Sequence, residues 1–328
     1  MYKEMLQENT VLAIREHDRT LNAIVESIIS TGNVEIFDEI SVKDVGAAFV
    51  QTIKKIFYHI VDAISIAFTF IGETFNKSYS AFKKYSYLAK TNIDFNKEVK
   101  FKTGIVSVSK TKHDVINLCI GRLDNVIKEF TKNIGNQQEL QQDIKVINAL
   151  LQISDAKLSA TKIDIDSGSS IDWAKYNKNL VSIIVRGESN QEIKPVTHTK
   201  IATACKSNAD IKKMLAFLSN RRPYTAMAII KREARIMCNK AIKNASKESG
   251  AASNEVKGII KLANLCMTTT TNTLSACKSA YSALSRDYIT ILSIIAKQTS
   301  KEDKESANKK ELKMTSGKAY GSSYIDYD

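Results

Sequence analysis

Proline is nearly absent from this sequence, and its scarcity restricts the fold. The 328 residues include two prolines, Pro195 and Pro223, and 12 glycines. Both residue types interrupt helices and supply turns, so a chain with few of them favours long helices over a turn-rich β fold. We therefore expect a mainly α protein, an elongated multi-helix bundle with long helices.

Sequence patterns of catalytic and metal sites are also missing. The four histidines stand far apart, and neither H-E-x-x-H nor a Cys/His zinc spacing occurs. The phosphate-binding pattern G-x-x-x-x-G-K-S/T, the dinucleotide pattern G-x-G-x-x-G and the nucleophile pattern G-x-S-x-G are absent. A site assembled from residues distant in sequence would leave no such trace. We predict a protein that is not an enzyme and that holds no cofactor and no metal ion.

The five cysteines form no C-x-x-C pair, and their number is odd. Scattered cysteines of this kind are typical of reduced, mostly buried thiols rather than of a disulfide framework. The first residues, MYKEMLQENT, are polar and acidic, whereas a signal peptide has a basic start and an apolar core. Both features predict an intracellular or particle-enclosed protein that is not secreted by way of a signal peptide.

The longest apolar pattern lies between Ser41 and Lys90, a stretch without proline. Its branched and aromatic side chains recur at three- and four-residue steps, which places them on one wide face of a helix. Such a face packs in a bundle, binds a partner or lies on a membrane surface. The candidate membrane- or partner-binding residues are Ile56, Phe57, Ile60, Ile64, Phe68 and Ile71.

Asp62, near the middle of this apolar stretch, argues against a transmembrane span. A centrally placed Asp costs about 2.5 to 3.5 kcal/mol on insertion. The surrounding window also lacks the roughly twenty uncharged apolar residues that a span needs. We therefore favour a buried bundle helix over an interfacial membrane helix, and both over a transmembrane helix.

Positive charge dominates the chain, with a formal net charge of +13 and a pI near 9.3. The leader through Asp44 has nine acidic and four basic residues, whereas residues 200–248 have twelve basic and three acidic residues. Basic surfaces suit nucleic acid or anionic lipid, although a solvated helix face gives the same pattern. The candidate nucleic-acid- or anion-binding residues are Arg221, Arg222, Lys231, Arg232, Arg235, Lys240, Lys243 and Lys247.

Turn and periodicity signals divide the chain into four parts. Residues 1–90 hold the acidic leader and the long amphipathic helix, and residues 91–186 hold a β-hairpin near 99–109 and a helical pair. Residues 187–299 form a basic helical bundle, and residues 300–328 a disordered tail. Helices are expected over residues 2–30, 112–133, 137–162, 172–185, 197–220, 224–247 and 252–297, with Asp172 as a cap and Trp173 as an anchor.

The front of the chain carries a family resemblance. The opening MYKEMLQENTVLAIREHDRTLNAIVESI is followed by a short acidic patch and by the Ile/Phe/Lys helix IKKIFYHIVDAISIAF. Over about the first 90 residues this pattern resembles virion structural proteins of large tailed bacteriophages, several of which are helical, basic and packaged inside the head. The resemblance implies assembly into a virion, in the capsid interior or associated with the particle, and a cytoplasmic location in the host during assembly. It transfers no specific functional residue.

Two hypotheses about function follow. In the first, the chain is a non-enzymatic bacteriophage virion structural protein, in one form an internal head protein, whose basic helices contact packaged DNA, other virion proteins or further copies of itself. In the second, it is a membrane-active helical effector or ejection protein that inserts residues 56–75 into a bilayer with an anionic surface. Added salt separates them, because contacts to phosphates weaken as salt rises.

Overall fold

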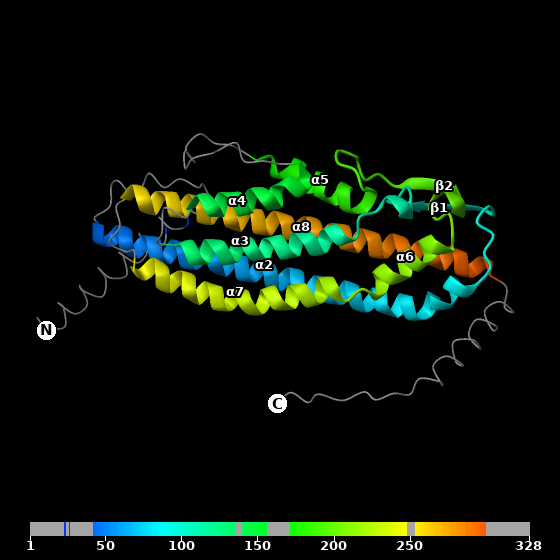
Figure 1. Cartoon of the computed structure of the whole chain (residues 1–328), viewed down its shortest axis with the longest axis horizontal. Helices are drawn as coiled ribbons and strands as arrows, with labels where there is room; N and C mark the ends of the chain where they lie inside the picture. The colour runs from blue at the N-terminus through cyan, green and yellow to red at the C-terminus, as the bar shows by residue number, and fades with distance from the viewer. Residues whose placement is uncertain are drawn as a thin grey trace, which may run out of the picture. The chain divides into compact units, whose positions relative to one another are not determined.

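The structure, a computed structural model, describes residues 23, 26, 42–134, 140–155, 171–247 and 253–299. Most of these residues are helical, which confirms the predicted mainly α class. Apart from residues 23 and 26, the predicted leader helix lies outside the described residues, as does the predicted disordered tail. The helices and strands (Figure 1) are α2 (Val42–Tyr85), α3 (Asp114–Asn133), α4 (Leu140–Leu151), α5 (Trp173–Arg186), α6 (Asn208–Ser219), α7 (Arg222–Lys247), α8 (Ser253–Gln298), β1 (Glu98–Thr103) and β2 (Val196–Lys200).

Two helices, α2 with 44 residues and α8 with 46, have the lengths that the scarcity of proline predicts. A run of threonines crosses the middle of α8, and threonine is a poor helix former. The helix continues because burial outweighs this low propensity, since Thr269, Thr270 and Thr273 are fully buried. Hydroxyls in the run find acceptors in the preceding turn. Oγ1 of Thr270 donates to the carbonyl of Cys266 at 2.7 Å, and Oγ1 of Thr268 to that of Asn264 at 2.9 Å.

The helix that the sequence predicts over residues 137–162 is shorter in the structure. Helix α4 ends at Leu151, and a turn of 3₁₀ helix, Gln152–Ser154, follows it. Asp155 then has a φ of 58°, in the left-handed region that commonly ends a helix. The prediction of one continuous helix is therefore wrong at Asp155.

The small sheet is present, but its pairing differs from the predicted hairpin. Strand β1 pairs antiparallel with β2, so that Phe101 lies opposite His198. The residues expected to return beside β1 turn away instead, and the N–H of Val108 donates to the carbonyl of Ala204 at 2.9 Å. The helix predicted from residue 197 is also wrong, because a Val-Thr-His-Thr segment with β-branched alternation follows Pro195. That helix begins only at Asn208.

The described contacts divide the chain into two units, each made of three separate segments. Unit one contains Met1–Ile71, Asp114–Val181 and Arg222–Ser279, and unit two contains the three segments between and after them. Helices α2 and α8 contribute residues to both units. The division into four consecutive parts that the sequence suggests stays a prediction.

Unit one is a helical core. The rings of Phe57 on α2 and Phe130 on α3 stack with centroids 5.8 Å apart. Helix α5 joins through Tyr176, whose hydroxyl lies 2.8 Å from Oγ1 of Thr273 on α8. Tyr176, not the predicted Trp173, is the buried anchor of α5, because Tyr176 is 1% exposed and Trp173 is half-buried. Asp172 caps α5 as predicted, with its Oδ1 accepting from the N–H of Lys175 at 2.9 Å.

Unit two contains the small sheet, α6 and the end of α8. Two buried polar side chains hold the sheet in place, His198 from β2 and Asp287 from α8. Oδ2 of Asp287 accepts a hydrogen bond from the N–H of Gly104 at 2.5 Å. A Cβ atom at Gly104 would lie 3.0 Å from that oxygen, so a larger residue here would displace the Asp287 carboxylate by a few tenths of an ångström.

Candidate nucleic-acid interface

Helix α7 has the two faces that the sequence predicts. Its apolar side is buried in unit one, where Ile230, Ala234 and Met237 are each less than 9% exposed. Its basic side faces solvent, and Lys240, Lys243 and Lys247 are exposed. Burial of the apolar side fixes the rotation of α7, and this rotation presents the lysines on one surface.

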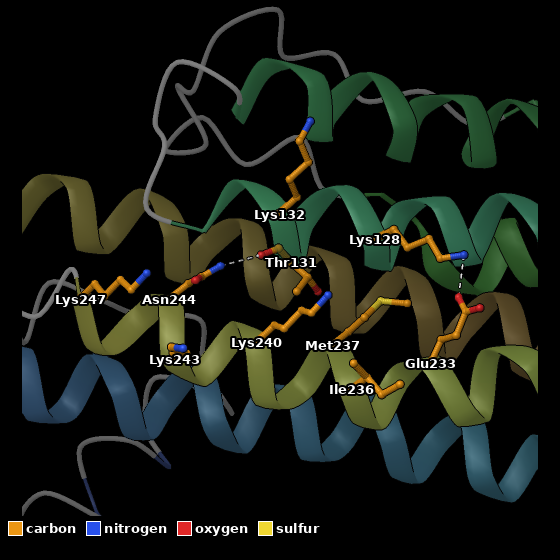
Figure 2. Close-up of a pocket in the computed structure, with 10 residues that line it drawn as sticks. All are labelled: Lys128, Thr131, Lys132, Glu233, Ile236, Met237, Lys240, Lys243, Asn244 and Lys247. Atoms are coloured by element: carbon orange, nitrogen blue, oxygen red, sulfur yellow. Dashed lines mark hydrogen bonds and ion pairs between the residues drawn. The ribbon is translucent and has the colours of Figure 1, made fainter.

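A groove runs between α7 and α3, which contact each other along unit one. Its cavity volume is about 610 Å³. Figure 2 shows its lining side chains, which come from two segments about a hundred residues apart in sequence. The lining residues are Lys128, Thr131, Lys132, Glu233, Ile236, Met237, Lys240, Lys243, Asn244 and Lys247.

Carboxylates neutralise one side of this groove. Nζ of Lys128 lies 2.5 Å from Oδ2 of Asp124 and 2.6 Å from Oε2 of Glu233. Hydrogen bonds to these two carboxylates raise the pKa of Lys128, so it stays charged but is matched by acidic partners. Lys132 lies 3.9 Å from Glu129 in a weaker, exposed pair.

The three lysines at the other end of the groove carry its uncompensated charge. Within the part of the chain that the structure describes, Lys240, Lys243 and Lys247 have no ion pair with a carboxylate. They are spaced at i, i+3 and i+7, so they form one row along α7. The groove is therefore positive where α7 approaches its C-terminal end, a location that the helix dipole also favours for cations.

The floor of the groove is partly apolar. Ile236 is 52% exposed and Met237 is buried. Nδ2 of Asn244 donates to the carbonyl of Thr131 at 3.3 Å, which ties α7 to α3 at the lysine end. The two walls are therefore fixed relative to each other, and the lysines project from a helix rather than from a loop.

The structure brings together only part of the predicted basic set. Lys240, Lys243 and Lys247 line the groove, whereas the other five residues do not. Arg232 and Arg235 are exposed on other parts of α7, and Nζ of Lys231 lies 4.5 Å from the ring centroid of Phe68. The remaining two are Arg221 and Arg222, both exposed at the start of α7.

Most of the predicted membrane- or partner-binding face lies in the core of the fold. Five of its six residues are at most 1% exposed, so this face is not accessible in the structure: Ile56, Phe57, Ile60, Ile64 and Ile71. The sixth, Phe68, is half-buried and stacks on Tyr224 with centroids 5.0 Å apart. The large apolar residues that α2 does expose include Tyr58, Ile66 and Phe70.

Helix α2 is nevertheless long and apolar enough to cross a membrane, by length and composition only. The stretch Val45–Lys90 contains an 18-residue window with a mean hydropathy of 1.4, of which 33% is buried. Core helices of soluble proteins share this length and composition.

Neither metal ligands nor reactive thiols gather in the described part of the chain. No group of three His, Cys, Asp or Glu side chains there could hold a metal ion. All five cysteines are free and buried. Burial raises the pKa of Cys205 and of Cys266 to about 12, which makes both thiols poor nucleophiles near neutral pH.

The fold and the groove together define a mainly helical protein with a basic groove on one unit. Comparison with protein-family models, curated proteins and solved structures finds no match for this chain.

Proposed function

We propose that this chain is a non-enzymatic bacteriophage virion structural protein that contacts packaged DNA through the groove between α3 and α7. The observation that supports DNA contact is the row formed by Lys240, Lys243 and Lys247, which have no carboxylate partner among the described residues. The virion role rests on the sequence resemblance at the front of the chain.

The spacing of the lysine row suits a nucleic-acid backbone. Seven residues of α-helix rise about 10 Å, the axial length of roughly three nucleotides of one DNA strand. Lysine ammonium groups bind phosphates as point charges and read no bases. The groove would therefore bind DNA without sequence preference, as a protein that lines or fills a capsid requires.

The number of lysines sets the expected affinity and its response to salt. Three phosphate contacts predict a slope of about −2.7 in a plot of log K against log salt. Such a site binds weakly, with a Kd of roughly 10⁻⁴ to 10⁻⁶ M near physiological salt. Many copies acting together in a particle would supply the remaining avidity.

The experiment compares duplex DNA binding by two charge-matched double variants, at about 50 and 200 mM salt. Lys240→Gln with Lys243→Gln removes two groove charges, and Arg232→Gln with Arg235→Gln removes two charges from α7 outside the groove. We expect the first variant to lower the magnitude of the salt slope by about 1.8 and the second to change it little. Equal losses from both would show that net charge, not the groove, attracts DNA.

Membrane insertion of residues 56–75 is the second candidate function, favoured by the apolar composition of α2 and by exposed Ile66 and Phe70. It requires more rearrangement, since five of the six predicted apolar residues would have to leave the core. Salt-resistant liposome binding that Phe68→Asp abolishes would support this candidate over the groove. Retained liposome binding in that variant would exclude it.

A further inference from the structure

The C-terminal part of α2 carries exposed aromatic and basic side chains that the groove does not use. Tyr79 is 39% exposed. The rings of Tyr79 and Phe82 stack with centroids 5.8 Å apart, and Nζ of Lys83 lies 4.9 Å from the centroid of the Tyr79 ring. We refer to Tyr79, Phe82 and Lys83, which share one face of α2 at i, i+3 and i+4 and lie in unit two, as the Tyr79 strip, with Lys77 and Lys84 on the adjoining exposed part of the helix.

Basic residues outnumber acidic ones around the strip. Lys77, Lys83 and Lys84 are exposed and residues 74–93 contain no Asp or Glu, with Glu73, also exposed, one turn before Lys77. The opposite side of the same helix is packed in the fold, where Ser78, Ala81 and Tyr85 are buried. The strip is therefore a positively charged, partly aromatic surface held rigidly by a packed helix.

We propose that the Tyr79 strip docks this protein on an anionic phospholipid surface, with α2 lying along the surface and not crossing it. Tyrosine rings prefer the interface between headgroups and acyl chains, where one end is apolar and the other wet. Lysine stems cover apolar surface while their ammonium groups reach lipid phosphates. A packed helix that offers one such side matches the geometry of a peripheral membrane surface.

Single-stranded nucleic acid is the main rival occupant, because bases stack on exposed aromatic rings. The ring of Tyr79 already has neighbours on it: Phe75 at 5.7 Å, Phe82 at 5.8 Å and the ammonium of Lys83 at 4.9 Å. A base would have to displace one of them before it could stack. A lipid interface needs only the ring edge and the hydroxyl, which leaves these contacts intact.

The first test is co-sedimentation with phosphatidylcholine vesicles, with and without phosphatidylglycerol. We expect binding only to the anionic vesicles. Lys83→Gln and Lys84→Gln should each weaken it roughly fivefold, since a lysine near an anionic surface contributes about 1 kcal/mol. Tyr79→Ser should weaken it by a comparable factor at a salt concentration that leaves the lysine contribution small.

Tyr58 supplies a matched control for Tyr79. It lies on the same helix, is 49% exposed and has Nζ of Lys54 at 5.8 Å from its ring centroid, but it is outside the strip. Tyr58→Ser should leave vesicle binding unchanged. Equal loss from Tyr58→Ser and Tyr79→Ser would overturn the proposal, as would equal binding to neutral vesicles.

A second measurement needs no loss of function. Tyr79→Trp should show a blue shift of the added tryptophan emission on addition of anionic vesicles, whereas Tyr58→Trp should not, with the signal of Trp173 subtracted as a common background. The absence of a shift in Tyr79→Trp would overturn the proposal even if Tyr79→Ser failed to fold. Binding of a single-stranded oligonucleotide in place of vesicles, lost in Tyr79→Ser, would assign the strip to nucleic acid instead.

Discussion

His198 stabilises the small sheet of unit two from its buried side. Its ring stacks on Phe101, the residue opposite it on β1, with centroids 4.8 Å apart. Nε2–H donates to the carbonyl of Ile105 at 3.0 Å, and Nδ1 lies 3.0 Å from Oγ1 of Thr203. Burial lowers the pKa of His198, although the Ile105 hydrogen bond and the charge of Asp287 act in the opposite direction. The folded protein therefore favours the neutral imidazole.

This preference predicts a pH dependence of stability. Below about pH 6.5 the unfolded chain protonates His198 while the folded chain resists, so stability falls as pH falls through that range. We expect the Tm of the wild type to decrease between about pH 7.5 and about pH 5.5, and His198→Gln to reduce this decrease. Thermal unfolding followed by circular dichroism across the range measures it.

The control for this prediction is His59→Gln, which removes an exposed histidine from α2. It should keep the wild-type decrease in Tm. Asp287 has the opposite effect on the pH dependence of stability. Burial raises its pKa, so the folded state gains stability as pH falls towards the carboxyl range. A His198→Gln protein whose Tm falls with pH as steeply as that of the wild type would contradict the prediction.

At the scale of elements, helix α5 tests whether a cap identified from sequence stabilises the fold. Asp172→Ala removes the side-chain acceptor for the N–H of Lys175. We expect the free energy of unfolding to fall by about 1 kcal/mol, the usual cost of losing an N-cap. Chemical denaturation measures it, and Lys175→Ala, an exposed change in the same turn, should cost much less. Equal effects from both variants would show that the cap bond contributes nothing.

The same element shows what local patterns predict and what they do not. Asp172 was identifiable as a cap because a cap depends on neighbouring residues. The anchor was not, because whether Trp173 or Tyr176 is buried depends on the side of α5 that faces Thr273 on α8. The sheet follows the same rule, since β1 and β2 pair across more than ninety residues and only their alternation is local.

For the same reason, only the α7 wall of the groove could be predicted from the sequence. The lysine row on α7 follows from helical spacing within one segment, and Lys240, Lys243 and Lys247 were all identified from sequence. The other wall was missed, because nothing in the local sequence of α3 indicates that Lys128 and Lys132 lie beside α7. The number of basic residues in the sequence also overstates the positive charge of the groove, since carboxylates from α3 and α7 neutralise Lys128.

At the scale of the whole molecule, the two units are assembled from segments that alternate along the chain. Periodicity and turn signals are read in chain order, so they cannot indicate which helices share a core. The long helices cause this alternation of segments, because a single helix such as α2 or α8 supplies core residues to both units. The two candidate surfaces also separate by unit, with the groove in unit one and the Tyr79 strip in unit two.

This separation predicts that binding to DNA and binding to lipid depend on different residues. Lys240→Gln with Lys243→Gln should weaken duplex DNA binding and leave anionic vesicle binding at the wild-type level. Lys83→Gln with Lys84→Gln should do the reverse, although both variants lose the same charge from a protein with a net charge of +13. Parallel titrations of both variants with DNA and with vesicles measure the two effects. If each variant weakened both partners equally, binding would follow total charge, and neither surface would be a distinct site.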